Sequence, residues 1–254
     1  FPAVKAVGED LGDRIFYLTA KTVTRTVAEE AFGILRDQGL RLKTVTLTAK
    51  EKLCICETPD CNPDACPYAK GHFDRINDAV YELLTTGPDA LNREVLRSQA
   101  EQYRVCPFEL SLDTASWTDA IICDYNYVFD PKVRLKRFFG EGVKGDYLFL
   151  IDEAHNLVER GREMFSATLC KEDFLELKRA LKGRDKKAER LLERCNRYLL
   201  GLKRECETWQ VHENIDPLIL LVLSLSTELD RLREEGLEPE LDEKVLEFWF
   251  ILRD

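Results

Sequence analysis

The sequence lacks any hydrophobic run long enough to cross a membrane. Its longest apolar stretch, residues 218–223, is followed by serines and charged residues, whereas a membrane-spanning helix needs roughly 20 consecutive apolar residues. The chain begins with Phe1-Pro2-Ala3 and has neither the basic nor the apolar region of a signal peptide. We therefore predict a protein without a membrane segment, and we interpret these residues as starting inside a longer protein.

The phosphate-binding loop found in many nucleotide hydrolases is also absent. None of the 13 glycines begins the pattern G-x-x-x-x-G-K-[ST], and the glycine-rich residues 140–145 lack its spacing and its terminal hydroxyl. Such a loop binds the phosphates of ATP through backbone N–H groups and a lysine. We therefore expect that the chain does not hydrolyse ATP alone and that it is truncated on its N-terminal side.

An excess of basic residues is missing as well. The net charge is −10, although the share of hydrophobic residues, 44%, is ordinary for a globular protein. A chain of this charge does not bind nucleic acid over its whole surface, because phosphate binding depends on lysine and arginine. Any DNA strand would have to follow a local basic groove.

Cysteines, in contrast, are frequent and clustered. Nine is an awkward number for a disulfide framework, and a chain of 254 residues does not need one. Prolines and short polar residues surround Cys54, Cys61 and Cys66, which are 7 and 5 positions apart, and Cys106 follows 40 positions later. Zinc sites usually contain two close pairs, so the spacing favours a [4Fe–4S] cluster over zinc, with unliganded buried thiols third. The clustering indicates a reducing compartment.

Residues 147–151 form an apolar run that leads directly into Asp152 and Glu153. The run predicts a strand buried on both faces. Parallel sheets bind ligands at the carboxyl ends of their strands, where Asp152 would suit Mg²⁺ and Glu153 would suit a water that attacks a γ-phosphate. A solvated acidic loop is the alternative. The full tetrad Asp-Glu-Ala-His resembles the Walker B box of DEAH-type helicases.

Three further segments, 14–19, 43–48 and 119–123, have the pattern of buried strands, and helical periodicity occurs at 24–38, 73–86 and 89–103. Strands separated by helices predict an α/β fold, a partial RecA-like parallel sheet of the P-loop NTPase type. After the first strand, Thr19, Lys21 and Thr22 would contact a sugar-phosphate backbone. The alternative is a cluster of helix N-cap residues.

The residues after 165 have a helical pattern throughout. Apolar residues recur at three and four positions in segments 174–181, 188–202, 218–232 and 241–252, which predicts a helical bundle. Cys170, Cys195 and Cys206 are predicted to be buried thiols.

The order of these features resembles the XPD/Rad3 family of iron–sulfur DNA helicases, to which DinG is also related. A Cys-rich insertion ends in Cys106-Pro107-Phe108, and the segment 121–131 and the Asp-Glu-Ala-His box follow. The likeness is close over residues 14–165 and loose over 166–254. It implies a partial motor domain in 1–50, an iron–sulfur domain in 51–110, the rest of that motor domain in 111–165 and part of a helical arch in 166–254.

The same resemblance assigns the metal ligands and the catalytic residues. It implies that Cys54, Cys61, Cys66 and Cys106 bind the [4Fe–4S] cluster, while Cys56 is surplus and could replace Cys61. Asp152 would hold Mg²⁺, Glu153 would activate water, and His155 would couple the nucleotide state to a second motor domain.

For DNA, the resemblance points to Lys50, at a position that tends to be basic near the cluster, and to Phe108, which could stack on a base. Core packing of Phe108 is the equal alternative. Of Tyr125 and Tyr127, one is expected to face the nucleic acid, which we take to be Tyr125, and the other the core. His72 is expected on the surface, because four cysteines suffice as ligands.

We therefore interpret the chain as a central fragment of an ATP-dependent helicase that moves 5′ to 3′ on single-stranded DNA and separates duplex at its iron–sulfur domain. Expected partners are single-stranded or forked DNA and, with a phosphate loop, ATP; the expected state is a monomer in the cytoplasm or nucleus. One alternative is a non-catalytic zinc-containing module that binds nucleic acid. Another is an exonuclease of the DinG type, which requires a nuclease domain outside these residues.

Overall fold

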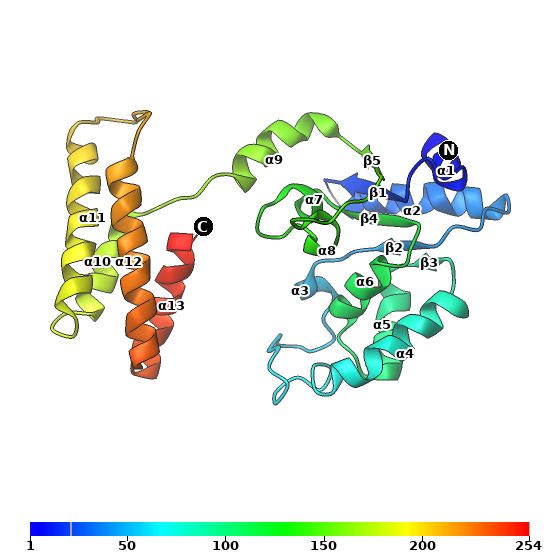
Figure 1. Ribbon diagram of the computed structural model, residues 1–254, viewed down its shortest axis with the longest axis horizontal. Coiled ribbons are helices and arrows are strands. Elements are labelled where there is room, and N and C mark those ends of the chain that lie inside the picture. Colours follow the sequence, from blue (N-terminus) through cyan, green and yellow to red (C-terminus); the bar gives the residue numbers. More distant parts are fainter. Residues whose placement is uncertain (21, 254) are drawn as a thin grey trace. The chain divides into compact units, whose positions relative to one another are not determined.

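The computed structural model describes residues 1–20 and 22–253, without the side chains of Thr22 and Val23. Its contacts divide the chain into two units, residues 1–165 and 166–254 (Figure 1). No helix in the described ranges combines the length and the apolar character that a membrane crossing requires.

A five-stranded, all-parallel sheet forms the centre of the first unit, which confirms the predicted α/β fold. The strand order is β3-β2-β4-β1-β5. The strands are β1 (Arg14–Thr19), β2 (Thr44–Thr46), β3 (Ala90–Leu91), β4 (Ala120–Asp124) and β5 (Tyr147–Ile151).

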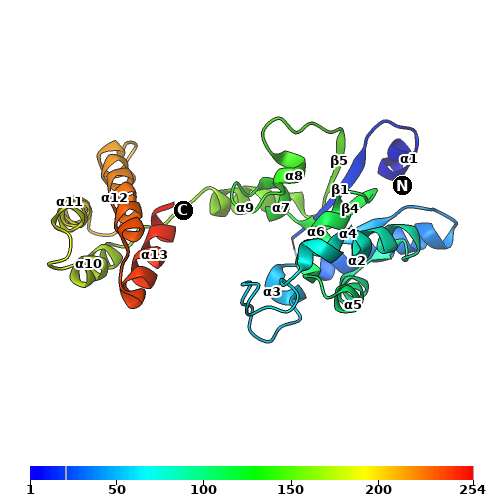
Figure 2. The ribbon, with the colours of Figure 1, turned by 60° about the horizontal axis from the view of Figure 1, so that its bottom comes forward.

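Helices cover both faces of this sheet (Figures 1 and 2). The helices of this unit are α1 (Pro2–Gly8), α2 (Thr22–Asp37), α3 (Lys50–Leu53), α4 (His72–Thr85), α5 (Arg93–Tyr103), α6 (Pro107–Ala115), α7 (Asn126–Phe129), α8 (Lys136–Phe139), the short 3₁₀ helix η1 (Ala154–Asn156) and α9 (Leu157–Met164). Alternation along β1 separates two cores: Ile15 packs with Phe32 of α2, whereas Phe16 and Leu18 belong to the core that contains α4, α5 and α6.

The sequence prediction missed β3 and began the following helix too early. Ala90 and Leu91 pair with Thr44 and Val45 of β2, so residues predicted as the first turn of a helix are a strand. The helix begins after Asn92, whose side chain accepts a hydrogen bond from the N–H of Val95. A strand of two residues is too short for a period of two to be visible in the sequence.

The strand β5 lies at the edge of the sheet, so the prediction that it is buried on both faces was wrong. Among the described strands it pairs only with β1. The side chains of Phe149 and Leu150 are 42% and 37% exposed. An apolar run indicates a strand but does not report how many neighbours cover it.

The second unit consists of helices α10 (Lys171–Ala180), α11 (Lys186–Arg204), α12 (Asp216–Glu235) and α13 (Pro239–Arg253). Phe174, Leu192, Leu225 and Val245 lie in its core. Cys195 is buried there as predicted, but Cys170 is exposed and Cys206 is only half-buried. Both lie at helix ends, where periodicity does not determine burial.

A buried glutamate joins α11 to α12 in this unit. The Glu228 side chain is only 2% exposed and accepts hydrogen bonds from Lys187 and Arg231, each at 2.5 Å. Arg231 also pairs with Asp185, the N-cap residue of α11, at 2.6 Å. Burial alone would raise the pKa of Glu228, but these hydrogen bonds outweigh it and hold the pKa below its ordinary value of 4.5.

Replacing this carboxylate should destabilise the chain in a pH-dependent way. For Glu228→Gln we expect the free energy of unfolding at pH 7 to fall by about 1–3 kcal/mol, because charged hydrogen bonds are lost. The difference from wild type should shrink as pH falls through the lowered pKa, since the wild-type carboxylate then becomes protonated. Urea denaturation at pH 7 and in acid measures both. Glu240→Gln, which alters an exposed ion pair with Lys244, is the control, and an equal loss in both variants contradicts the prediction.

Candidate metal centre and active site

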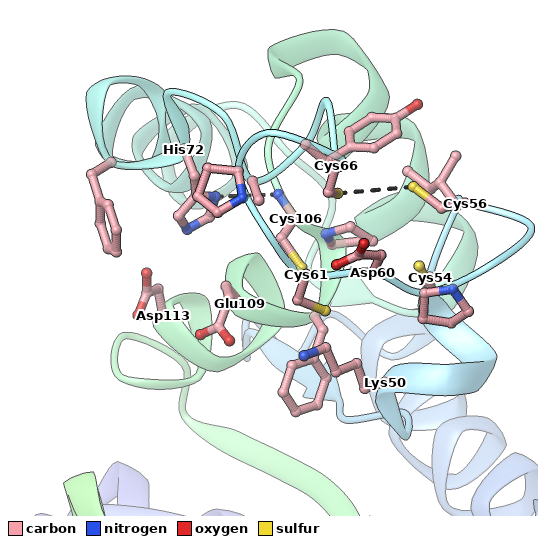
Figure 3. A pocket seen from close by; sticks show the side chains of 18 of the residues that line it. Lys50, Cys54, Cys56, Asp60, Cys61, Cys66, His72, Cys106, Glu109 and Asp113 are labelled. Carbon is pink, nitrogen blue, oxygen red and sulfur yellow. Dashed lines mark hydrogen bonds between the residues drawn. The ribbon is translucent and has the colours of Figure 1, made fainter. Parts of the chain in front are cut away.

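Five cysteines line one pocket of about 430 Å³ in the first unit (Figure 3). Cys54, Cys56, Cys61 and Cys66 lie on or beside the irregular segment between α3 and α4, and Cys106 is the N-cap residue of α6. The structure therefore brings together the four predicted ligands and the surplus cysteine. The return of the chain through α4 and α5 accounts for the position of Cys106.

Short-range hydrogen bonds fold the cysteine segment. Asp60 accepts from the N–H of Asn62 at 3.1 Å, and Asn62 accepts from the N–H of Asp64 at 3.0 Å, so two side chains that are two positions apart stabilise turns. Pro59 and Pro63 prevent a regular helix here. The segment is thus compact without secondary structure, which leaves its thiols facing the pocket.

The thiols share the pocket without forming a closed coordination site. Figure 3 shows Cys56 and Cys66 pointing toward one another, with their sulfur atoms 3.9 Å apart. Burial, with a contribution from Cys66, raises the pKa of Cys56 to about 11. In the part of the chain that the structure describes, no three Cys, His, Asp or Glu side chains are placed to hold one metal ion.

His72 fixes the backbone at Cys106. Its Nδ1 accepts a hydrogen bond from the N–H of Cys106 at 3.2 Å, across 34 positions of sequence. The side chain is buried, which lowers the pKa of His72, so the expectation of a surface residue was wrong. Burial also raises the pKa of the Cys106 thiol, more than the N–H groups of Glu109 and Phe108 lower it.

The donor set fits a cysteine-ligated metal centre. Thiolates are the ligands of iron–sulfur clusters and of many zinc sites, and at least four thiols line this pocket. Because metals bind the thiolate, and because burial raises the pKa of the Cys106 thiol, binding of a metal by Cys106 would release a proton.

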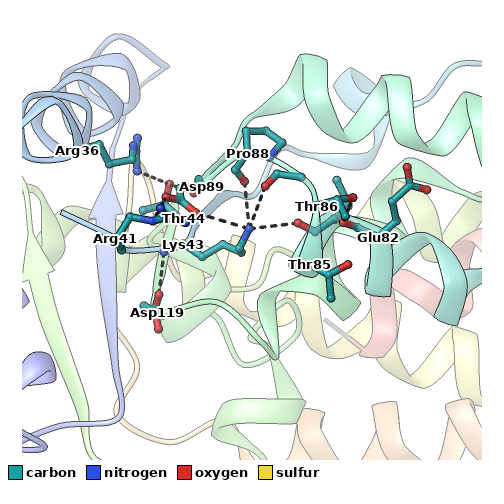
Figure 4. Close-up of polar contacts among 12 residues, drawn as sticks. Arg36, Arg41, Lys43, Thr44, Glu82, Thr85, Thr86, Pro88, Asp89 and Asp119 are labelled. Carbon is teal, nitrogen blue, oxygen red and sulfur yellow. Dashed lines mark hydrogen bonds and ion pairs between the residues drawn. The ribbon is translucent and has the colours of Figure 1, made fainter. Parts of the chain in front are cut away.

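Lys43 holds the helices of this insertion against the sheet (Figure 4). Its ammonium donates to the backbone carbonyls of Leu83 at 3.2 Å and of Gly87 and Pro88 at 3.3 Å, and it lies 3.7 Å from the carboxylate of Asp89. A Cβ on Gly87 would approach the Leu83 carbonyl oxygen to 2.6 Å, so only glycine allows this close turn. The end of α4 is therefore fixed beside β2.

Carboxylates gather where β4 and β5 end. In the register of the sheet Leu18 pairs with Ile151, and Thr19 pairs with Asp124, so Asp152 and Asp124 flank the end of β1. The N–H of Asp152 donates to the carbonyl of Leu18 at 3.0 Å. The structure thus places Asp152 at the carboxyl edge of a parallel sheet, as the sequence predicted.

The next residues turn sharply. Glu153 has φ of 51°, a left-handed conformation that costs free energy in a non-glycine residue and often occurs at functional sites. Its carboxylate is 49% exposed and lies 3.3 Å from Nδ1 of His155. Sequence reasoning missed Asp124 and its partner Arg160, 3.7 Å away, because a single Asp after a strand carries no recognisable motif.

The residues that were predicted to contact nucleic acid differ in their burial and position. Thr19 is buried and its hydroxyl donates to the carbonyl of Cys123 at 3.4 Å, so its side chain is structural. Lys21 lies outside the described residues, and the side chain of Thr22 is not described. Lys50 and Phe108 are half-buried and line the cysteine pocket.

Tyr125 was predicted to face nucleic acid, and this was wrong. The side chain is completely buried, and its hydroxyl donates to the backbone carbonyl of Asp152. Tyr127 is buried as well, because both residues continue into the short helix α7 rather than along a strand. The hydroxyl of Tyr125 instead supports the turn that carries the two carboxylates.

The chain is similar to parts of several helicases. The family model described as DEAD_2 matches residues 42–174, more than half of the chain. The general transcription and DNA repair factor IIH helicase subunit XPD/RAD3 of Saccharomyces cerevisiae is 31% identical over 167 residues, which are 66% of this chain and 20% of that protein. The regulator of telomere elongation helicase 1 of Rattus norvegicus is 26% identical over 161 residues, 59% of this chain and 12% of that protein.

The chain spans a fifth or less of the length of these curated relatives. Among solved structures, one described as Truncated XPD aligns with 98% of this chain and 73% of its own length, with 16% sequence identity and a TM-score of 0.48.

Removing the Tyr125 hydroxyl should destabilise the acidic turn. For Tyr125→Phe we expect the free energy of unfolding to fall by about 1–2 kcal/mol, because the half-buried Asp152 loses the donor to its backbone carbonyl. Tyr81→Phe is the matched control, since Tyr81 is 70% exposed and its change should stay within about 0.5 kcal/mol. Urea denaturation of the full chain compares them, and indistinguishable midpoints would argue against the supporting role.

Proposed function

The chain belongs to the DEAD_2 family of XPD/Rad3-type helicases, and from this premise we propose that it is part of an ATP-dependent DNA helicase that carries a [4Fe–4S] cluster. The observation that carries the proposal is the position of five cysteines around one pocket, in the same unit as a parallel sheet with Asp152 and Glu153 at its carboxyl edge. A zinc module would account for the thiols but not for this acidic edge.

In the proposed centre, Cys54, Cys61, Cys66 and Cys106 hold the cluster and Cys56 remains a free thiol. When bound, the cluster would supply a redox-active inorganic core that cross-links the cysteine segment to α6. His72 would act as a positioning residue, because its Nδ1 orients the backbone of Cys106 without touching the metal.

At the acidic edge, Asp152 would hold the Mg²⁺ that accompanies ATP and Glu153 would orient the attacking water. His155, whose Nδ1 lies 3.3 Å from the Glu153 carboxylate, would couple the nucleotide state to a second motor domain. The sequence has no phosphate loop, so we propose no ATP turnover for these 254 residues alone. Lys50 and Phe108, which line the cysteine pocket, are the proposed DNA contacts.

Serine substitutions test the cluster. After anaerobic reconstitution with iron and sulfide, we expect wild type to absorb near about 400 nm and to bind about four iron atoms. Cys54→Ser, Cys66→Ser and Cys106→Ser should each lose most of this absorption, because serine is a poor ligand for iron–sulfur clusters. Cys170→Ser, at an exposed position outside the pocket, should retain it.

Two further comparisons test which cysteine is the second ligand and which cofactor is bound. Cys61→Ser should lose the cluster and Cys56→Ser should keep it; the reverse pattern would transfer the second ligand to Cys56. A colourless protein that binds one zinc ion and no iron would contradict the proposed cofactor.

His72 variants test the positioning role. Because the side-chain oxygen of asparagine can accept the N–H of Cys106 in place of Nδ1, His72→Asn should keep the cluster, whereas His72→Leu should release iron to a chelator several-fold faster. Iron release is measured in reconstituted protein, with Phe73→Leu as the control for the exposed neighbour. Equal release rates in the leucine and asparagine variants of His72 would contradict its positioning role.

A further inference from the structure

A second groove, of about 590 Å³, adjoins the cysteine pocket. Lys50, Phe108 and Arg137 line both, and the outer wall of the second groove is formed by residues 133–137, which precede and enter α8. Glu51 and Tyr127 also line the second groove. None of the relatives' names and none of the motifs in the sequence assigns a role to this wall.

The wall belongs to a strongly basic segment, residues 131–137, which we call the basic loop. Four of its seven residues are basic, in a chain with a net charge of −10: Lys132, Arg134, Lys136 and Arg137. Arg137 is already paired with Asp113 at 2.9 Å. Arg134 and Lys136 are exposed, and their side chains make no hydrogen bond or ion pair with the described residues.

Buried anchors hold the basic loop in place. The Asp130 carboxylate accepts the N–H groups of Lys132 at 2.8 Å and Val133 at 3.3 Å, and the N–H of Leu135 donates to the carbonyl of Tyr127 at 2.9 Å. Leu135 and Phe138 are each only 6% exposed. The cations between these anchors therefore face outward on an ordered backbone, and little conformational entropy is lost when they bind an anion.

A further contact fixes α8 on the sheet. The ring of Phe138 lies 5.4 Å from that of Phe16 on β1, and the ring of Phe139 lies 5.1 Å from Phe16. The aromatic pair is buried or half-buried against β1, whereas Lys136, on the same short helix, lines the groove. Hydrophobic packing thus determines where the cations stand.

We propose that this groove binds the phosphates of single-stranded DNA, with Arg134 and Lys136 as the contacts. The inference rests on the proposed function and extends it to residues outside the helicase motifs. Cations beside an aromatic ring are the combination with which proteins bind single strands without reading sequence, and the half-buried Phe108 supplies that ring where the groove meets the cysteine pocket. An acidic peptide would use the cations but not that ring.

The test compares two double variants of the full chain. We expect Arg134→Ala with Lys136→Ala to bind a fluorescent 20-nucleotide oligo-dT about tenfold more weakly than wild type at low salt, and to lower the salt slope by roughly 1.4, because two phosphate contacts are lost. Lys5→Ala with Lys144→Ala removes the same charge from exposed positions outside the groove and should change affinity less than about twofold.

Each outcome separates the two proposals. Equal affinities of the two double variants, with the absorption of the reconstituted cluster unchanged, would overturn the role of the basic loop and leave the proposed function standing. Preference for a duplex of the same length would overturn it too. If wild type has no cluster and binds no DNA, the proposed function itself fails. Circular dichroism and thermal melting establish that both variants are folded.

Discussion

Parallel hydrogen bonding between β1 and its two neighbours is the constraint on which both candidate sites depend. It aligns Thr19 with Asp124 and Leu18 with Ile151, so that two chain segments far apart in sequence deliver carboxylates to one edge. The same edge is where β2 ends and leads into α3, whose first residue, Lys50, lines the cysteine pocket. Parallel strands require long crossover connections. The cysteine-rich insertion occupies one of these connections, and its position therefore follows from the topology of the sheet.

Side chains of β1 extend this constraint in two directions. Phe16 belongs to the core under α4, α5 and α6 and also contacts the aromatic rings that anchor α8. Buried groups near the acidic edge serve the backbone: Thr19 bonds to the carbonyl of Cys123, and Tyr125 bonds to that of Asp152. These two hydroxyls were predicted to bind a ligand, but they donate hydrogen bonds to backbone carbonyls at the ends of the strands. A buried carbonyl without such a donor would cost free energy.

The features that could be predicted from the sequence are those that produce a local pattern of apolar residues. Residues 14–19 were predicted as a strand and form β1, because six residues suffice for an apolar pattern, and the position of Asp152 followed from the apolar run before it. The two-residue β3 and the edge position of β5 could not be predicted, since they depend on partners distant in the chain. The burial of His72 was missed for a related reason: its partner, the N–H of Cys106, lies 34 positions away, and no local pattern marks a long-range acceptor.

Lys50 lines both the cysteine pocket and the second groove. The neighbouring Cys61 side chain is the largest cause of the raised pKa of Lys50, and Cys106 and Glu109 act in the same direction. The same side chain lines the groove beside the basic loop. Charges a few ångströms apart at a partly buried site interact far more strongly than in water. In the proposed function, a phosphate that approaches Lys50 would compete with the cysteine sulfur for one cation, and metal binding, which changes the charge on that sulfur, would alter the affinity of Lys50 for the phosphate. By reciprocity, a strand bound in the proposed groove would alter the affinity of the pocket for its metal.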